Sequence, residues 1–393
     1  MTNRSNGGGH GELLQVLRDG KPRTRAELAA LTGLARSTIR LRVESLSALN
    51  LISAIGEAAS SGGRPPSQFA LNASARVVIG ADIGANHAGV VLSDLNGKIL
   101  ARHREELAVE SGPVVILEWL VATARRLLAE TGRASRDLIT VGVGVPGPVE
   151  HRTGRPISPP IMPGWDGFDV RGWIEGELGV PVLVDNDVNI MAVGEHAVAF
   201  PEVADLLFVK VATGIGSAII AGGALQRGAQ GAAGDIGHAR LERADGVACG
   251  CGNVGCLEAI AAGPAIVRAL WETGTHIRDN RGIAQAAARG DIKVIRALRQ
   301  AGRDVGEVLS TCVNLLNPSV IVLAGSVAGA GDQLLAGVRE VVYERSTPLA
   351  TKTLQILPTQ MGADAAAVGA SILAIQHGLS PESIDSMVAE TAP

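Results

Sequence analysis

The sequence is poor in aromatic residues, which make up only 2% of its 393 positions. Its hydrophobic content of 46% therefore comes mainly from Val, Leu, Ile and Ala, and it is sufficient for the cores of two or three domains. Fifty glycines are typical of a fold with many tight turns between strands and loops. The composition thus predicts a globular chain of two or three domains.

Long apolar segments and disulfide patterns are also missing. The sequence contains no run of eighteen uncharged apolar residues and no charged and apolar leader at its start. It has four cysteines, and three of them lie close together beside a histidine, which favours metal binding in a reducing compartment. We therefore expect a cytoplasmic protein that has no membrane partner.

The formal net charge of −4 is unevenly distributed along the chain. Residues 1–76 contain ten Lys and Arg against five Asp and Glu, whereas residues 77–393 contain 25 against 34. A small basic head on a larger acidic body is typical of a nucleic-acid-binding module joined to another function.

The first part of the head predicts two short helices. Residues 1–9 are polar and rich in glycine, and we expect a disordered tail there. A helix over 12–18 places its leucines on one face. Thr24 and Glu27 have the spacing of a capping box, which predicts the start of a second helix.

A third helix is predicted over 36–49, after a turn at Gly33. Its buried face consists of Ile39, Val43 and Leu46, and the opposite face near its start carries Arg36, Ser37, Thr38 and Arg40. Two strands follow and are joined by a flexible loop that contains Arg64. This order is typical of a winged helix-turn-helix over 10–75, whose third helix enters the major groove. Arg64 either reaches a minor groove or is a solvated loop arginine. An ordinary three-helix domain with a solvated arginine face is the alternative.

The segment 234–258 predicts a metal site. One imidazole and three thiolates form a complete tetrahedral set for Zn²⁺, supplied by His238, Cys249, Cys251 and Cys256. No coordination position is left open, so the zinc is expected to be structural. The alternative is three unpaired thiols and a surface histidine. Cys312 lies in an apolar run and is expected in the core.

Two acidic residues adjoin the predicted metal ligands. Asp235 precedes His238, and Glu258 follows Cys256. A metal loop would hold both carboxylates in place, which suits hydrogen bonding to a ligand with many hydroxyl groups. Two solvated acids are the alternative.

The body from residue 76 onward alternates strands and helices in two series. Each series opens with a strand and a hairpin, at 76–106 and at 205–223, and this order indicates two α/β lobes with a cleft between them. We assign 76–190 to a small lobe and 191–364 to a large lobe. The segment 365–393, with a helix over roughly 365–377, is expected to return to the small lobe.

Several motifs together carry a resemblance to a known family. They are GVGVPGPV at 142–149, DNDVN at 185–189, TGIGSAI at 213–219, the zinc segment, and a helix-turn-helix head followed by a GRP-containing linker. The chain resembles the ROK family of actin-like, two-lobed sugar kinases and sugar-responsive repressors. The resemblance covers nearly the whole chain and implies an actin-like body.

The resemblance also implies roles for single residues. Asp187 corresponds to the catalytic base, and the sugar-binding positions are Asn186, Asp187, Asp235, His238 and Glu258. The ATP phosphate positions are Asp82 and the 213–217 loop with Thr213, Gly214 and Gly216, and Gly325 lies on the adenosine side. For Asp187, anchoring of the sugar and capping of the following helix remain alternatives.

Departures from the kinase pattern favour a sensor. The kinases carry DIGGT where this chain has DIGANHAGV, so that Ala85 and His87 crowd the phosphates and bound ATP and Mg²⁺ are not expected. Asp235 replaces a glutamate, and Ile161 stands where an asparagine is common. We predict a transcription regulator, most consistent with a repressor, which binds operator DNA as a dimer or tetramer and releases it when a sugar or sugar phosphate binds. An ATP-dependent sugar kinase and a repressor controlled by a partner protein are the alternatives.

Overall fold

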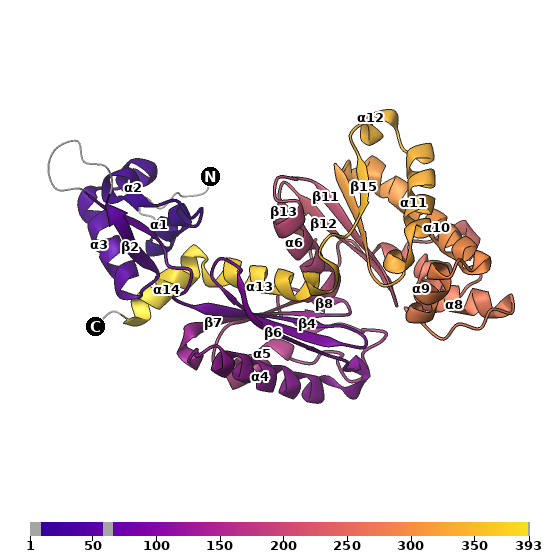
Figure 1. Ribbon diagram of the computed structural model, residues 1–393, viewed down its shortest axis with the longest axis horizontal. Coiled ribbons are helices and arrows are strands. Elements are labelled where there is room, and N and C mark those ends of the chain that lie inside the picture. Colours follow the sequence, from indigo (N-terminus) through magenta and orange to yellow (C-terminus); the bar gives the residue numbers. More distant parts are fainter. Residues whose placement is uncertain (1–8, 58–65, 392–393) are drawn as a thin grey trace.

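The computed structural model describes residues 9–57 and 66–391, which form a head, a small lobe and a large lobe (Figure 1). The head and the large lobe lie at opposite ends of the molecule. A long helix, α13 (Ala365–Gly378), runs from the junction of the two lobes toward the head. The predicted disordered tail lies outside the described residues except for Gly9. Arg64, which was predicted to contact a minor groove, also lies outside them.

The head contains the three helices and two strands that its sequence predicts, and one further short strand that was not predicted. They are α1 (His10–Leu17), β1 (Arg23–Thr24), α2 (Arg25–Thr32), α3 (Arg36–Ala48), β2 (Ile52–Glu57) and β3 (Ser67–Leu71). The strands form a sheet in the order β1-β3-β2, in which β3 pairs antiparallel with both neighbours. The expected apolar face of α3 is buried.

The start and the end of α2 follow from local chemistry. The Glu27 amide donates to Thr24 Oγ1 at 3.2 Å, and the Thr24 amide donates to Glu27 Oε2 at 2.7 Å. This reciprocal cap contributes about 1 kcal/mol to such a helix. Gly33 ends α2 with φ 72°, a left-handed conformation that glycine adopts without a steric cost. The turn therefore aims α3 away from α2.

The small lobe is built on a five-stranded sheet in the order β10-β7-β4-β5-β6. Its strands are β4 (Val77–Ile83), β5 (Ala88–Asp94), β6 (Ile99–Glu105), β7 (Leu138–Val145) and β10 (Val182–Asn186). Helices α4 (Pro113–Glu130) and α5 (Val170–Leu178) pack on one face, and α13 packs on the other (Figure 1). A short hairpin of β8 (Val149–Glu150) and β9 (Arg155–Pro156) follows β7.

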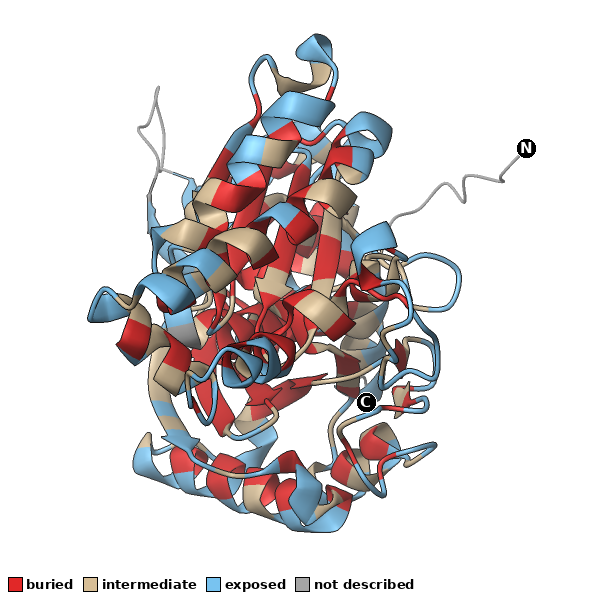
Figure 2. Cartoon of the chain, turned by 90° about the vertical axis from the view of Figure 1, so that its right-hand side faces the viewer, coloured by how far each residue is buried: buried red, intermediate tan, exposed pale blue. Residues whose placement is uncertain are grey.

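The large lobe has a second five-stranded sheet, in the order β13-β12-β11-β14-β15. Its strands are β11 (Leu206–Val211), β12 (Ile215–Ala221), β13 (Ala224–Gln226), β14 (Val320–Ala324) and β15 (Gln355–Pro358). Helix α6 (Asp187–Ala199) packs on one face. The other face is covered by α8 (Gly263–Glu272), α9 (Asn280–Ala288), α10 (Ile292–Leu316) and α11 (Asp332–Arg345). These helices turn a buried side to the sheet and an exposed side outward (Figure 2).

The two lobes meet where α6 crosses α13. A Cβ added at Gly369 would lie 1.7 Å from the carbonyl oxygen of Ile190, and one added at Gly194 would lie 2.3 Å from that of Ala365. The two backbones are therefore in direct contact. The same helix pair joins both sheets, so a change in lobe closure must pass through this crossing.

We expect Gly369→Ala to destabilise the fold by about 1–3 kcal/mol or more, because the new methyl group has to push α6 and α13 apart. Urea unfolding followed by circular dichroism measures the effect. Gly176→Ala is the matched control, since a Cβ at Gly176 in α5 meets nothing within 4 Å. The control is expected to be stabilising by roughly 0.5–1 kcal/mol. Equal unfolding midpoints for Gly369→Ala and wild type would contradict the close crossing.

The head shares its core with the body. Leu13 and Leu17 of α1 belong to one buried cluster that also includes Ile139 of the small lobe, Ile375 of α13 and Ile384. The last of these lies in α14 (Pro381–Thr391), a second helix that follows the predicted one after a break at Leu379 and Ser380. The Gly11 amide donates to Asp385 Oδ1 of α14 at 3.0 Å. The head is thus anchored to the C-terminal helices.

Regular elements that were not predicted include α5, α9, α11, α14, β8, β9, β13 and β15. Across the residues that the structure describes, no helix has the length and apolar character needed to cross a membrane.

Candidate functional site

The four predicted metal ligands come together. The ligand atoms of His238, Cys249, Cys251 and Cys256 all lie within 4.8 Å of one another. Cys249 Sγ is 3.7 Å from His238 Nδ1, and Cys251 Sγ is 3.8 Å from Cys256 Sγ. Such a compact set of one nitrogen and three sulfur atoms matches a tetrahedral zinc site.

Backbone geometry explains how the loop reaches this shape. The Cys249 amide donates to the Asn253 carbonyl at 2.8 Å, which closes a tight turn around Cys251. Gly252 and Gly255 have φ values of 92° and 89°, a left-handed region that favours glycine. The three cysteines can therefore point to one side within eight residues.

The chemistry of the thiols also fits a bound cation. Burial and the adjoining Cys251 and Cys249 thiols raise the pKa of Cys256 to about 12. Three neighbouring thiolates are therefore costly unless a positive ion neutralises them. Cys312 lies outside the cluster, against the core of the large lobe, where burial raises the pKa of its thiol.

Both acids beside the metal ligands lie near the predicted cleft. Asp235 Oδ1 is 3.9 Å from His238 Nε2, so the ring nitrogen that faces away from the cysteines faces this carboxylate. Glu258 begins α7 (Glu258–Ala261), and its Oε2 accepts a hydrogen bond from the Ile215 amide at 2.8 Å. A Cβ at Gly214 would lie 2.6 Å from the same oxygen. The metal loop therefore adjoins the glycine turn between β11 and β12.

Asn186 and Asp187 lie at the start of α6, and their side chains have different roles. Asn186 is the helix cap: its Oδ1 accepts from the Val188 amide and its Nδ2 donates to the Gly147 carbonyl, each at 2.9 Å. Asp187 is the first helical residue and is 4% exposed. Its Oδ2 accepts from Lys210 Nζ at 2.5 Å. The capping role considered for Asp187 thus falls to Asn186.

On the opposite side of the cleft, Asp82 lies at the end of β4 and is 5% exposed. Its Oδ2 is 3.0 Å from His87 Nε2. Gly325 follows β14 with φ 100°, and a Cβ there would lie 2.4 Å from the Val211 carbonyl oxygen. The residue after β14 therefore packs closely against the end of β11. The Asp82 carboxylate already has a polar contact, with the imidazole of His87.

Sequence reasoning missed two charged groups between the lobes. Lys210 interrupts the apolar strand β11, and this interruption was the signal in the sequence. Burial lowers the pKa of Lys210, but the charges of Asp187 and Asp82 more than compensate, and the net shift is upward.

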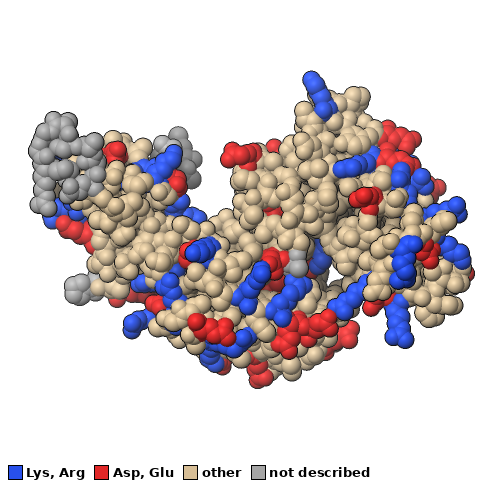
Figure 3. All heavy atoms as spheres, viewed as in Figure 1, with Lys and Arg blue, Asp and Glu red and all other residues tan. Residues whose placement is uncertain are grey.

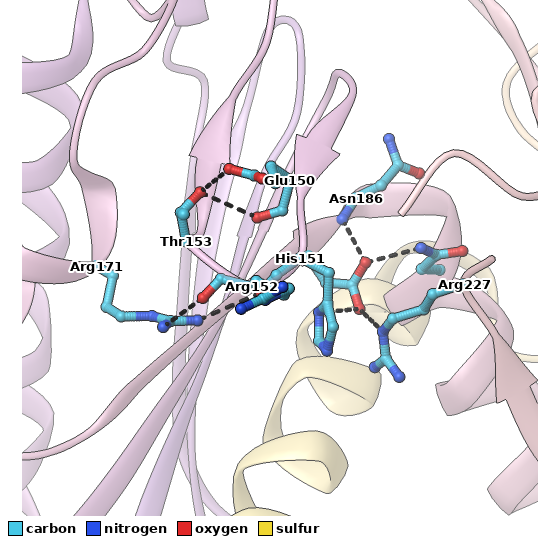
Figure 4. Close-up of polar contacts among 9 residues, drawn as sticks. Glu150, His151, Arg152, Thr153, Arg171, Asn186 and Arg227 are labelled. Atoms are coloured by element: carbon cyan, nitrogen blue, oxygen red, sulfur yellow. Dashed lines mark hydrogen bonds and ion pairs between the residues drawn. The ribbon is translucent and has the colours of Figure 1, made fainter. Parts of the chain in front are cut away.

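The other missed group surrounds Asp185. Its carboxylate accepts from Arg227 Nε and Asn189 Nδ2, each at 2.7 Å, and it lies 4.0 Å from His151 Nδ1 (Figure 4). Burial and Arg227 lower the pKa of His151. The DNDVN motif contains Asp185, but its partner Arg227 is 42 positions away in the chain. This cluster links the two lobes behind the cleft, since Arg227 follows β13.

The predicted DNA-contacting residues lie around the first turns of α3. Arg36, Ser37 and Arg40 are exposed, and Thr38 is half-buried. Arg40 forms an ion pair of 3.2 Å with Glu44, one turn along the helix. On the face shown in Figure 3, acidic and basic side chains of the lobes are mixed, without a large area of one sign.

Comparison with known proteins gives consistent matches. The ROK family model matches residues 78–377. The xylose repressor of Bacillus spizizenii is 30% identical over 368 residues, which are 93% of this chain and 94% of the repressor.

Solved structures agree. A ROK family transcriptional regulator, described as a homologue of the E. coli MLC protein, has a TM-score of 0.80 at 23% identity and covers 97% of this chain and 98% of its own. The ROK hexokinase from Thermus thermophilus has a TM-score of 0.66 at 31% identity and covers 77% of this chain and 98% of its own. The repressor and regulator matches thus extend over the head as well as the body. Because the family model spans most of the chain, the protein belongs to the ROK family.

Proposed function

We propose that the protein is a sugar-responsive transcriptional repressor. The head acts as a winged helix-turn-helix that binds operator DNA through the first turns of α3. The lobes act as the sensor, and a sugar bound between them releases the DNA. The main support is that the head shares one buried core with α13, the helix that also crosses α6 at the lobe junction.

This shared core supports a mechanical route from ligand to DNA. A sugar that closes the lobes shifts α6, and α13 has to move with it, because the two backbones touch and cannot deform independently. Helix α14 continues from α13 and holds α1 through Asp385. In a symmetric dimer, a small rotation of each head changes the spacing of the two recognition helices, and a palindromic operator then no longer fits.

Zinc bound by His238, Cys249, Cys251 and Cys256 cross-links the loop and fixes its shape. With the loop fixed, Asp235 and Glu258 are presented to the hydroxyl groups of the sugar, and His238 Nε2 adds a third polar group. Asp187 and Asn186, at the start of α6, add a carboxylate and an amide, so that the set of carboxylate, amide and imidazole groups suits a polyhydroxylated ligand.

The experiment is operator binding measured by fluorescence anisotropy, with a panel of sugars added to the zinc-loaded full chain. One sugar is expected to weaken operator affinity at least about tenfold, the usual scale of an allosteric coupling. Asp235→Ala is expected to raise the sugar concentration required, while operator affinity without sugar stays unchanged. The proposal fails if the protein binds a specific operator but no sugar, free or phosphorylated, alters that binding.

A sugar kinase is the second candidate, because the hexokinase from Thermus thermophilus is 31% identical over most of the body. Against it, Lys210 forms an ion pair with the carboxylate that would serve as the base. An assay of sugar-dependent ADP release separates the two functions. Turnover that disappears in Asp187→Ala would establish the kinase.

A further inference from the structure

The cleft contains its own cation. Lys210 extends from β11 of the large lobe, and its ammonium group lies 2.5 Å from Asp187 Oδ2 at the start of α6. The side chain of Lys210 is 23% exposed, and that of Asp187 is 6% exposed. The second carboxylate that attracts this ammonium group is Asp82, which stands on β4 of the small lobe. One lysine therefore neutralises carboxylates contributed by different parts of the cleft.

The imidazole of His87 occupies the space next to Asp82. His87 Nε2 is 3.0 Å from Asp82 Oδ2, and the ring also lies over the turn that follows β4. A Cβ built on Gly84 would be 2.1 Å from His87 Cε1. The Gly84 amide donates to the His87 carbonyl at 2.8 Å, so this amide is already used within the turn. The backbone after β4 is consequently covered by a side chain and closed on itself.

These contacts leave no place for a magnesium nucleotide. A divalent ion needs carboxylate oxygens that are free to coordinate, and phosphates need exposed backbone amides or unpaired cations. Here Asp82 is held by His87, Asp187 is held by Lys210, and the Gly84 amide is satisfied internally. The residues present therefore do not fit bound Mg²⁺ and ATP.

The charge of the cleft also discriminates between sugars. The ammonium group of Lys210 faces two carboxylates, Asp187 and Asp82, so the acidic groups outnumber the lysine in this part of the cleft. A phosphate group would be repelled by this excess, in a site where charges are only weakly screened. A hydroxyl group is accepted, because a carboxylate has about four acceptor positions and Lys210 uses one of those of Asp187.

We propose that Lys210 and His87 are a built-in replacement for the metal and nucleotide, so that the cleft binds an uncharged sugar alone. Lys210 acts as a positioning residue: its ion pair with Asp187 Oδ2 holds that carboxylate in place as a hydrogen-bond acceptor for the sugar. This inference rests on the proposed function for the presence of a sugar, but its statement about nucleotide does not.

The first test is calorimetric titration of the zinc-loaded full chain with the magnesium complex of AMPPNP, a nonhydrolysable ATP analogue. Wild type is expected to give no binding at millimolar nucleotide. The double variant His87→Thr with Lys210→Thr frees both carboxylates. It is expected to bind the nucleotide at least about tenfold more tightly than wild type, because the contacts to phosphate are no longer blocked. Lys352→Thr, an exposed lysine elsewhere, is the matched control and is expected to behave as wild type.

Nucleotide binding by wild type, or equal results for wild type and the double variant, would overturn the proposal. Zinc content and circular dichroism show whether the double variant is folded. If it is not, His87→Ala alone replaces it, because His87 is part-exposed and its removal uncovers Asp82 and the Gly84 turn.

The second test compares one sugar with its phosphate ester on wild type, once the sugar has been identified. The uncharged sugar is expected to bind at least about tenfold more tightly, because of the excess negative charge. Preference for the ester would overturn the proposal. A protein that binds no sugar at all contradicts the proposed function instead, and the nucleotide titration still decides the role of Lys210 and His87.

Discussion

Cys256→Ser is expected to prevent metal binding at the proposed zinc site and to weaken the response to sugar. Cys256 is 2% exposed and is the ligand closest to Glu258 in the chain. A structural zinc contributes an apparent ~10–16 kcal/mol of binding free energy to its site, so loss of one of four ligands releases most of the order in the loop. Sugar affinity is then expected to fall about 10- to 100-fold, as for other losses of support around a metal.

Metal analysis of protein purified without chelator and calorimetry with the effector sugar measure the two effects. Cys312→Ser is the matched control, because this cysteine packs against the core of the large lobe and takes no part in the metal cluster. The control is expected to retain a stoichiometric amount of zinc and wild-type sugar affinity. Wild-type protein that contains no zinc, or Cys256→Ser protein that still responds to sugar, would disprove the structural role of the metal.

The difference between these two cysteines shows which parts of the site are predictable from sequence. The clustering of His238 with the three cysteines could be predicted because the cysteines lie within eight residues and the glycines between them permit a tight turn. The capping box of α2 was predictable for the same reason, since Thr24 and Glu27 are three positions apart. Local patterns of this kind need no knowledge of the rest of the fold.

Contacts that arise only from tertiary packing were not predictable in this way. Lys210 and Asp187 are 23 positions apart, and they meet because β11 runs beside α6. Glu195 is fully buried in α6, and it accepts from Thr359 Oγ1 and the Gln360 amide at 2.6 Å, across more than 160 positions. A single sequence shows such residues only as charges in apolar surroundings and does not identify their partners.

Helix α14 illustrates another limit of sequence interpretation. Its sequence is short and mixed in polarity, and only Ile384 is fully buried. What it packs against depends on the direction in which α13 leaves the small lobe. The position of the head therefore follows from the packing of α13 on β4 and β7, which local patterns in residues 365–393 do not indicate.

Replacing Arg36 and Arg40 together by alanine is expected to weaken operator binding about 100-fold or more, because each arginine that contacts DNA contributes ~1–3 kcal/mol. The slope of log affinity against log salt concentration is expected to fall by about two, because each such arginine releases close to one counterion. Both side chains are exposed at the start of α3, and the Arg40 ion pair with Glu44 is too solvated to compete strongly with phosphate. Arg126→Ala on α4 removes a partly exposed arginine outside the head and is expected to leave affinity and slope unchanged. Anisotropy titrations across a range of salt concentrations distinguish the variants. If the double variant keeps the wild-type affinity and slope, α3 is not the DNA-contacting helix, and the repressor function would need another surface.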